Sequence, residues 1–395
     1  MSKAWTRSVP ELPAWPSREA AAITVQVKKA LRNPMTFNPA NPYNDLPLLP
    51  PKADVETKKV LKKVVAAGRT LAELKGLGAT IPNQSILVNS IVLQEAKASS
   101  EIENIITTND ALFEAFTSGS TRIDPATKEV LRYREALWVG YGDLKKRGLL
   151  TTNLFVKLVR IIKENSAGIR KLSGTVIQNV KTGAILYTPP TGEAIIRDKL
   201  RNLEEYIHAE DDLDPLIKLA IIHYQFEAIH PFYDGNGRTG RLLNSLYLVA
   251  RDLLDLPVLY LSKYIIDRKE EYYRLLRGVT TKGEWERWIL YILDAVQTTA
   301  VETKEKISAI RDLLGHTLEL GRRKLPAKVY SKELVEILFN QPYAKVQMLV
   351  DAGIAERKTA AVYLRECERA GILRGKKVGR EVLYLNVSLY KLLSK

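Results

Sequence analysis

The chain has 395 residues, and 46% hydrophobic and 27% charged residues are ordinary values for a soluble globular protein of about two or three domains. Cys367 is the only cysteine, which excludes an internal disulfide and a cysteine-rich zinc site. The sequence has no apolar run of the roughly 20 residues that span a bilayer and no secretory-type N-terminus, so we expect a cytoplasmic protein without a membrane partner.

The net charge of +15 is concentrated near the C-terminus. Residues 321–395 contain sixteen Lys and Arg against seven Asp and Glu. Such a local basic excess is typical of polyanion binding, although a solvated, solubilising surface has the same composition.

The N-terminal half reads mainly as helices. Residues 1–52 are rich in proline and aromatic residues and predict an extended arm wrapped on a core. Apolar spacing predicts helices within 56–116, one of them over 86–97, with Ser99 and Ser100 capping a further short helix. Helices over 126–149 and 151–164 follow. Two β-rich runs, 175–180 and 184–188, flank Lys181-Thr182-Gly183 and predict a hairpin.

The C-terminal half continues this helical pattern, with helices predicted at about 193–208, 212–229, 238–254, 266–278 and 282–315. Beyond residue 326 the pattern gives two short helices, a longer helix over 355–370, and two strands around a basic glycine turn. This order predicts a winged helix-turn-helix, a module that contacts DNA or another protein.

The stretch HPFYDGNGRTGR, residues 230–241, carries the most chemistry. Its glycines match the dinucleotide fingerprint G-x-G-x-x-G, but that fingerprint follows a strand, and the residues before His230 have helical spacing. A P-loop is excluded because Arg241-Leu242 stands where Lys-Ser/Thr is required. A zinc site is disfavoured because the four histidines form no His-x-x-x-His pair; they are His208, His223, His230 and His316.

The same stretch is well suited to bind an anion at a helix N-terminus. Glycines let successive backbone N–H groups point at one spot, and the positive end of the helix adds to their field. Arg238 and Arg241 share one face of the predicted helix and could hold two phosphates. Asp234 fits beside phosphates if a Mg²⁺ ion bridges them. His230, with an ordinary pKa near ~6.5, could then accept a proton from an incoming hydroxyl.

These twelve residues resemble the Fic signature H-x-F-x-[DE]-G-N-G-R-x-x-R at every fixed position. The segments YNDLPLLPP and EAKASSEIENI resemble the region before many bacterial Fic domains, so the resemblance runs from about Tyr43 to the C-terminus. It implies a protein adenylyltransferase, which moves AMP from ATP to Ser, Thr or Tyr hydroxyls of target proteins, itself included, and releases pyrophosphate.

The resemblance also implies a fold and a domain order. The expected fold is mainly α, a Fic-type helical core with a small β-hairpin flap plus a C-terminal winged helix-turn-helix. The expected order is an N-terminal arm and inhibitory helical region (1–120), a Fic catalytic core (121–290), a connecting helix (291–325) and the winged helix-turn-helix (326–395).

Roles for individual residues follow from the resemblance. It makes His230 the general base, Asp234 the Mg²⁺ ligand, Arg241 the γ-phosphate contact and Phe232 a core anchor. The phosphate nest would comprise Gly235, Asn236, Gly237 and Arg238. The flap residues that align a target segment by strand pairing would be Ile185, Leu186, Tyr187 and Thr188. Phosphocholine transfer stays open, because one arginine does not identify the nucleotide.

Ser99, Glu103 and Asn104 resemble the inhibitory motif [S/T]-x-x-x-E-[G/N] of the same family. A Glu103 carboxylate paired with Arg241 would occupy the γ-phosphate position, and ATP would bind unproductively; Glu101 fits the spacing less well. The sequence therefore predicts an autoinhibited enzyme that uses ATP and Mg²⁺. The alternative is a nucleotide-sensing, DNA-binding transcriptional regulator. A homodimer is expected, since relatives often pair.

Overall fold

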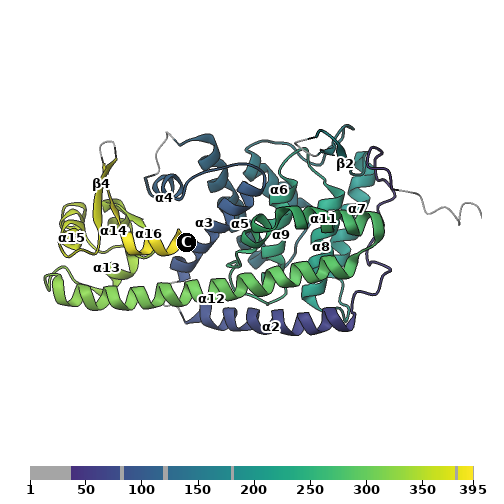
Figure 1. Ribbon diagram of the computed structural model, residues 1–395. Helices are drawn as coiled ribbons and strands as arrows, with labels where there is room; N and C mark the ends of the chain where they lie inside the picture. Colours follow the sequence, from purple (N-terminus) through teal and green to yellow (C-terminus); the bar gives the residue numbers. More distant parts are fainter. Residues whose placement is uncertain (1–36, 81–83, 119–122, 179–181, 379–380, 395) are drawn as a thin grey trace, which may run out of the picture.

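The computed structural model describes residues 37–80, 84–118, 123–178, 182–378 and 381–394. The fold is mainly helical, as predicted (Figure 1). The part before the flap has five helices within the described residues: α2 (Lys58–Ala79), α3 (Gln84–Ile102), α4 (Asn109–Ser118), α5 (Pro125–Arg147) and α6 (Thr152–Lys163). The flap is an antiparallel pair, β1 (Ile177–Gln178) and β2 (Ile185–Tyr187).

Six helices lie between the flap and the C-terminal segment, and they include the longest of the described chain. They are α7 (Glu193–His208), α8 (Pro215–Ile229), α9 (Asn236–Ala250), α10 (Leu261–Asp267), α11 (Lys269–Lys282) and α12 (Trp285–Lys324). Figure 1 shows α12 running the length of the molecule, with α2 alongside it. The flap lies at one end of α12 and the C-terminal segment at the other.

Local sequence signals explain where several helices begin and end. At the start of α5, the Asp124 side chain accepts a hydrogen bond from the Thr127 N–H, and Pro125 occupies the first turn. That helix ends at Gly148, whose φ of 71° suits glycine. Such caps satisfy backbone groups that the helix itself leaves without partners.

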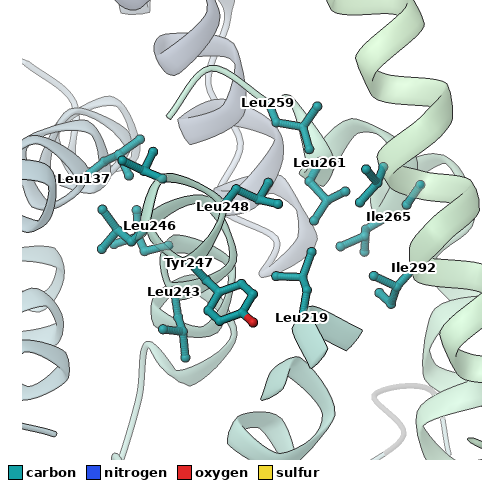
Figure 2. Close-up of a cluster of buried hydrophobic side chains, with 14 of the residues drawn as sticks. Leu137, Leu219, Leu243, Leu246, Tyr247, Leu248, Leu259, Leu261, Ile265 and Ile292 are labelled. Carbon is teal, nitrogen blue, oxygen red and sulfur yellow. The ribbon is translucent and has the colours of Figure 1, made fainter. Parts of the chain in front are cut away.

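The central helices α8 and α9 are buried along almost their whole length. Apolar residues lie on all sides of α8, whereas α9 also buries polar residues in its first turns, among them Arg238 and Arg241. Figure 2 shows how side chains of α8 and α9 meet those of α5, α10 and α12. The labelled members of this cluster are Leu137, Leu219, Leu243, Leu246, Tyr247, Leu248, Leu259, Leu261, Ile265 and Ile292. The loop of residues 230–235 connects these two buried helices, so the core fixes both of its ends.

Several predicted boundaries are wrong. Helix α3 continues to Ile102, so Ser99 and Ser100 lie inside a helix rather than capping a new one. Both serines are fully buried, and the burial of this face outweighs their preference for caps. The predicted helix over 266–278 is two helices, separated at Arg268 by a non-helical backbone. The predicted helix over 282–315 is α12, which is longer and crosses the predicted domain boundary at 290.

The predicted arm and hairpin are described only in part. Residues 1–36 and Lys181 lie outside the described residues. Residues 37–52, here called the N-terminal arm, form no helix or strand and pack against α7, α8 and the end of the flap. The two flap strands are shorter than the predicted runs.

The C-terminal segment has a separate small hydrophobic core that includes Leu334, Leu349, Leu364 and Cys367. Its elements are α13 (Lys332–Ile337), β3 (Tyr343–Ala344), α14 (Val346–Asp351), α15 (Arg357–Arg369), β4 (Arg374–Val378), β5 (Glu381–Leu385) and α16 (Val387–Leu393). The strands form an antiparallel sheet in the order β3-β5-β4. The sequence predicted neither β3 nor α16, and the winged helix-turn-helix stays a prediction, as do the domain boundaries.

The C-terminal segment is tied to α4 by charged and aromatic contacts. Lys376 Nζ lies 3.0 Å from Asp110 Oδ2 and 2.7 Å from Glu114 Oε2. The rings of Phe113 and Tyr390 meet edge to face at 6.0 Å. No helix in the described ranges combines the length and hydropathy needed to cross a bilayer.

Candidate active site

The loop after α8 places its histidine by an unusual backbone conformation. His230 caps α8 with φ 49° and ψ 59°, and Gly235 has φ 82° immediately before α9. Between them the Asn236 amide braces the turn, because its Oδ1 accepts from the Phe232 N–H and its Nδ2 donates to the Phe232 carbonyl, both at 2.8 Å. Phe232 itself is buried. Asn236 therefore shapes the loop, and Phe232 has the packing position predicted for a core anchor.

Arg170 supports this loop through hydrogen bonds to backbone carbonyls, a role that the sequence did not predict. Its side chain is 1% exposed. Its Nε donates to the His230 carbonyl at 2.8 Å, and its Nη2 donates to the Ile229 carbonyl at 3.3 Å and to the Pro190 carbonyl. This guanidinium joins the strained turn at His230 to the segment that follows the flap. An arginine in the segment between α6 and β1, outside any motif, gives no sequence signal for such a role.

A cavity of about 320 Å³ opens beside the loop. Part of its lining is polar and includes His230, Gly237, Arg241, Glu103 and Glu227. The rest of the lining comes from the N-terminal arm, the flap, α8 and α11 and is mostly apolar and aromatic: Phe37, Val176, Ile177, Leu186, Tyr187, Tyr224, Ala228, Tyr272, Tyr273, Leu276, Arg277 and Thr280. The backbone N–H end of α9 and a cationic side chain thus share one cavity with an imidazole, which suits a phosphate-bearing molecule with an apolar group.

Arg241 is held by the end of α3. Its Nε donates to Ser99 Oγ and its Nη2 to the Ser99 carbonyl, each at 2.8 Å, and Nη2 lies 2.7 Å from Glu103 Oε1. Burial raises the pKa of the Glu103 carboxyl, but the charge and hydrogen bond of Arg241 outweigh burial, and the net pKa is lowered. Glu103 is therefore ionised at neutral pH and neutralises a guanidinium that is 2% exposed.

Glu103 lies in a turn directly after α3, not inside the helix. Asn104, the next residue, has φ 62°, a conformation that asparagine tolerates better than most residues. Lys269 Nζ donates to the carbonyl of Ile102 at 2.5 Å and so satisfies the end of α3 from the start of α11. Asn104 does not line the cavity; its contribution is to the shape of the turn.

Near Asp234 and Arg238, four side chains form ion pairs in which positive and negative charges alternate: Arg238, Glu129, Lys163 and Asp234. Arg238 is 1% exposed, and its Nη1 lies 2.5 Å from Glu129 Oε1. Lys163 Nζ lies 2.9 Å from the same Glu129 oxygen and 2.6 Å from Asp234 Oδ2. The sequence pointed to Arg238 and Asp234 but missed Glu129 and Lys163, which lie on α5 and α6 and have no motif around them.

His230 and Glu227, which both line the cavity, have strongly shifted pKa values. Burial lowers the pKa of His230 to about 4, and the positive charge of Arg170 acts in the same direction. Burial raises the pKa of Glu227 to about 7. His230 is therefore neutral at physiological pH, with a lone pair free to accept a proton.

The flap residues have divided positions. Leu186 and Tyr187 line the cavity, whereas Ile185 and Thr188 do not. The Tyr187 hydroxyl donates to the Ala228 carbonyl at 2.7 Å, which ties the flap to α8. In the described part of the chain, no cluster of three or more His, Cys, Asp or Glu side chains is arranged to hold a metal ion by itself.

Comparison with known families identifies the class of protein that this loop and fold define. Residues 61–142 match the Fic/DOC family N-terminal model, residues 149–248 match the Fic/DOC family model, and residues 313–389 match the C-terminal domain model of SoFic-like protein adenylyltransferases. The chain therefore carries a Fic domain, preceded by a Fic N-terminal region and followed by a SoFic-like C-terminal domain.

The curated relatives are named protein adenylyltransferases, but each aligns with only a short region of this chain. A protein adenylyltransferase, fic-1, of Caenorhabditis elegans is 28% identical over 35% of this chain and 26% of its own length. A probable protein adenylyltransferase of Aquifex aeolicus is 36% identical over 22% of this chain and 27% of its own length. The chain thus spans only about a quarter of the curated relatives that it matches.

Solved structures share the fold. A Fic family protein from Desulfovibrio desulfuricans G20 aligns with a TM-score of 0.53 and 19% identity over 86% of this chain and 98% of that chain. Fic-1 of C. elegans, residues 134–508, aligns with a TM-score of 0.50 and 18% identity, over 62% of this chain and 73% of that chain.

Proposed function

We propose that this protein is an autoinhibited protein adenylyltransferase that transfers AMP from ATP to Ser, Thr or Tyr hydroxyls of target proteins and of itself. The observation that carries the proposal is one cavity in which His230, the N-terminal turn of α9 and Arg241 face the same space. The names of the relatives agree with this activity.

The reaction needs a base next to a phosphate site. The neutral His230 imidazole takes the proton of the target hydroxyl as its oxygen forms a bond to the α-phosphorus of ATP. The bond from the α-phosphorus to the bridging oxygen breaks, and pyrophosphate leaves. The backbone N–H groups at Gly235 to Gly237 and the two guanidinium groups of Arg238 and Arg241 hold the phosphates in position.

Asp234 fits the role of a Mg²⁺ ligand. Its carboxylate is 62% exposed at the start of α9, which leaves room for water and phosphate oxygens, and Mg²⁺ commonly takes one or two carboxylates plus substrate phosphates. When bound, the ion would neutralise charge on the triphosphate. The ion pair between Asp234 and Lys163 competes for the same carboxylate, so metal binding would displace the Lys163 ammonium.

Inhibition rests on the contact between Glu103 and Arg241. A guanidinium that already bonds to Ser99 and to a carboxylate has no free face for a γ-phosphate, and a second anion would be repelled by Glu103. The proposal is tested by incubating the Glu103→Gly protein with ATP, Mg²⁺ and cell extract. Mass spectrometry should find AMP on hydroxyl side chains. Finding no AMP on this protein or on any protein of the extract would overturn the proposal.

The exposed cations of α15 support a second candidate function, the binding of duplex DNA by the C-terminal segment. Arg357, Lys358 and Arg365 are exposed on this helix, whereas Lys376 is paired with acidic residues of α4. Fluorescence anisotropy of a labelled duplex over a range of salt tests this function, with Arg365→Glu weakening the binding. No binding at low salt would remove it.

A further inference from the structure

The N-terminal arm is fastened to the catalytic core along its backbone. The Lys199 ammonium donates to the Leu46 carbonyl at 2.7 Å, and the Gln225 amide donates to the Pro47 carbonyl at 2.9 Å. The Asn202 amide makes two bonds to the backbone of Leu49, at 2.8 and 3.0 Å. These side chains come from α7 and α8, so the helix that ends at His230 also holds the arm.

The arm then passes the end of the flap. The Tyr43 N–H donates to the Thr188 carbonyl at 2.9 Å, and the Thr188 hydroxyl donates to the Pro39 carbonyl at 2.7 Å. These two hydrogen bonds join the backbone of the arm to the residue that follows β2. Phe37, six residues before Tyr43 on the arm, lines the cavity.

Phe37 completes an aromatic wall at that point. Its ring stacks on Tyr187 with centroids 6.0 Å apart and planes 15° apart, and it meets Tyr43 edge to face at 5.5 Å. Tyr187 belongs to the flap and lines the cavity, as does Phe37 itself. Phe37 and Tyr43 belong to the N-terminal arm and precede the first region matched by a family model, which begins at residue 61, whereas Tyr187 lies within the region matched by the Fic model.

The polarity of the cavity decides which part of a nucleotide meets this wall. Arg241, Gly237 and His230 are the lining residues that can bind phosphates, and Phe37, Leu186 and Leu276 belong to the apolar part of the lining. A nucleotide whose phosphates are held by Arg241 and Gly237 would place its base against this apolar part. A flat, apolar purine ring suits an aromatic wall, since stacking on aromatic side chains is a general mode of base recognition.

We infer that Phe37 is a base-contacting residue, so that the N-terminal arm forms part of the nucleotide site. This inference rests on the proposed function for the identity of the ligand, and it concerns binding rather than transfer. Loss of the Phe37 ring should weaken binding of the nucleoside part of ATP and leave the phosphate contacts intact.

Isothermal titration calorimetry with ATP and with inorganic tripolyphosphate tests this inference. The Phe37 substitutions are made in the Glu103→Gly protein, and Mg²⁺ is present throughout. Phe37→Ala should weaken ATP binding about tenfold, while the affinity for inorganic tripolyphosphate stays unchanged, and Phe37→Tyr should retain most of the affinity for ATP. Leu48→Ala is the matched control, because Leu48 lies on the same arm and is 56% exposed. Circular dichroism confirms that each variant is folded.

Two results would overturn the inference. One is equal ATP affinity in the Phe37→Ala and Leu48→Ala proteins. The other is a loss of tripolyphosphate affinity as large as the loss for ATP. Failure of the proposed function is distinguishable: a Glu103→Gly parent that binds ATP but transfers no AMP contradicts the function and leaves the base contact standing, whereas a parent that binds no ATP contradicts both.

Discussion

Arg241 and Glu103 are 138 positions apart in the chain, and their side chains meet at 2.7 Å beside the N-terminal end of α9. Removing the carboxylate frees the guanidinium for phosphate. We expect Glu103→Gly to tighten ATP binding by about ten- to a hundredfold, which corresponds to a coupling free energy of about 1–3 kcal/mol between the ion pair and the ligand. Titration calorimetry measures the change.

Glu101→Gly is the control for this substitution. Glu101 is two residues away, at the end of α3, and has no ion pair with Arg241 among the described residues, so glycine here removes a nearby carboxylate without releasing the arginine. Equal ATP affinity in the Glu103→Gly and Glu101→Gly proteins would show that the Glu103 carboxylate does not weaken ATP binding.

The Gly237→Ala substitution tests whether breaking the ion pair between Glu103 and Arg241 is enough to raise transfer activity. The Cβ of an alanine here would clash with Glu103 Oε1 and lie 2.9 Å from Arg241 Nη1. Gly237→Ala should therefore break the ion pair but also fill the phosphate nest, and self-labelling should stay low. The double variant Glu103→Gly/Gly237→Ala should bind ATP about tenfold more weakly than Glu103→Gly alone. Gly142→Ala, with no atom within 4 Å of its Cβ, serves as the neutral control.

The pH dependence of transfer should report the environment of His230. Burial lowers the pKa of this imidazole to about 4, so the base form persists well below the ordinary value near ~6.5. In the Glu103→Gly protein, kcat/KM should stay near its plateau down to about pH 5 and fall with a midpoint near pH 4. An acid limb centred near pH 6.5 would contradict the buried, neutral histidine. Circular dichroism at each pH shows whether the protein remains folded.

Arg170 should matter for stability as well as for activity. In Arg170→Ala the carbonyls of Ile229, His230 and Pro190 lose a buried donor, and we expect a loss of about 2–4 kcal/mol in the free energy of unfolding. Urea unfolding measures it. Arg160→Ala is the control, because Arg160 also donates to a backbone carbonyl but is exposed, and its loss should cost under about 1 kcal/mol.

The sequence was informative where function imposes fixed spacing. His230 and Asp234 fall in one loop and Arg241 in the first turns of the helix that follows it, and the glycines of this stretch require positive φ or close approach, so the proximity of the three residues follows from the chain itself. Glu103 was found because it belongs to a second short motif, although the structure moves it from a helix to the turn after α3.

The remaining parts of the site depend on tertiary packing. Arg170, Glu129, Lys163 and Phe37 come from four separate segments, and each is an ordinary residue in its own neighbourhood. Only the packing of α5 and α6 on α9, and of the arm on α7 and α8, brings them to the loop. The same cause moved the end of α3, where burial of Ser99 and Ser100 extended a helix that local preference would have stopped.

The central claim is tested most directly by the position of the label that ATP transfers. The Glu103→Gly protein is incubated with Mg²⁺ and ATP carrying ³²P at either the α- or the γ-phosphate, and labelled protein is measured. We predict incorporation from α-labelled ATP, none from γ-labelled ATP, and none from either in the Glu103→Gly/His230→Ala protein. Transfer of the γ-label, or undiminished α-labelling without His230, would contradict the account.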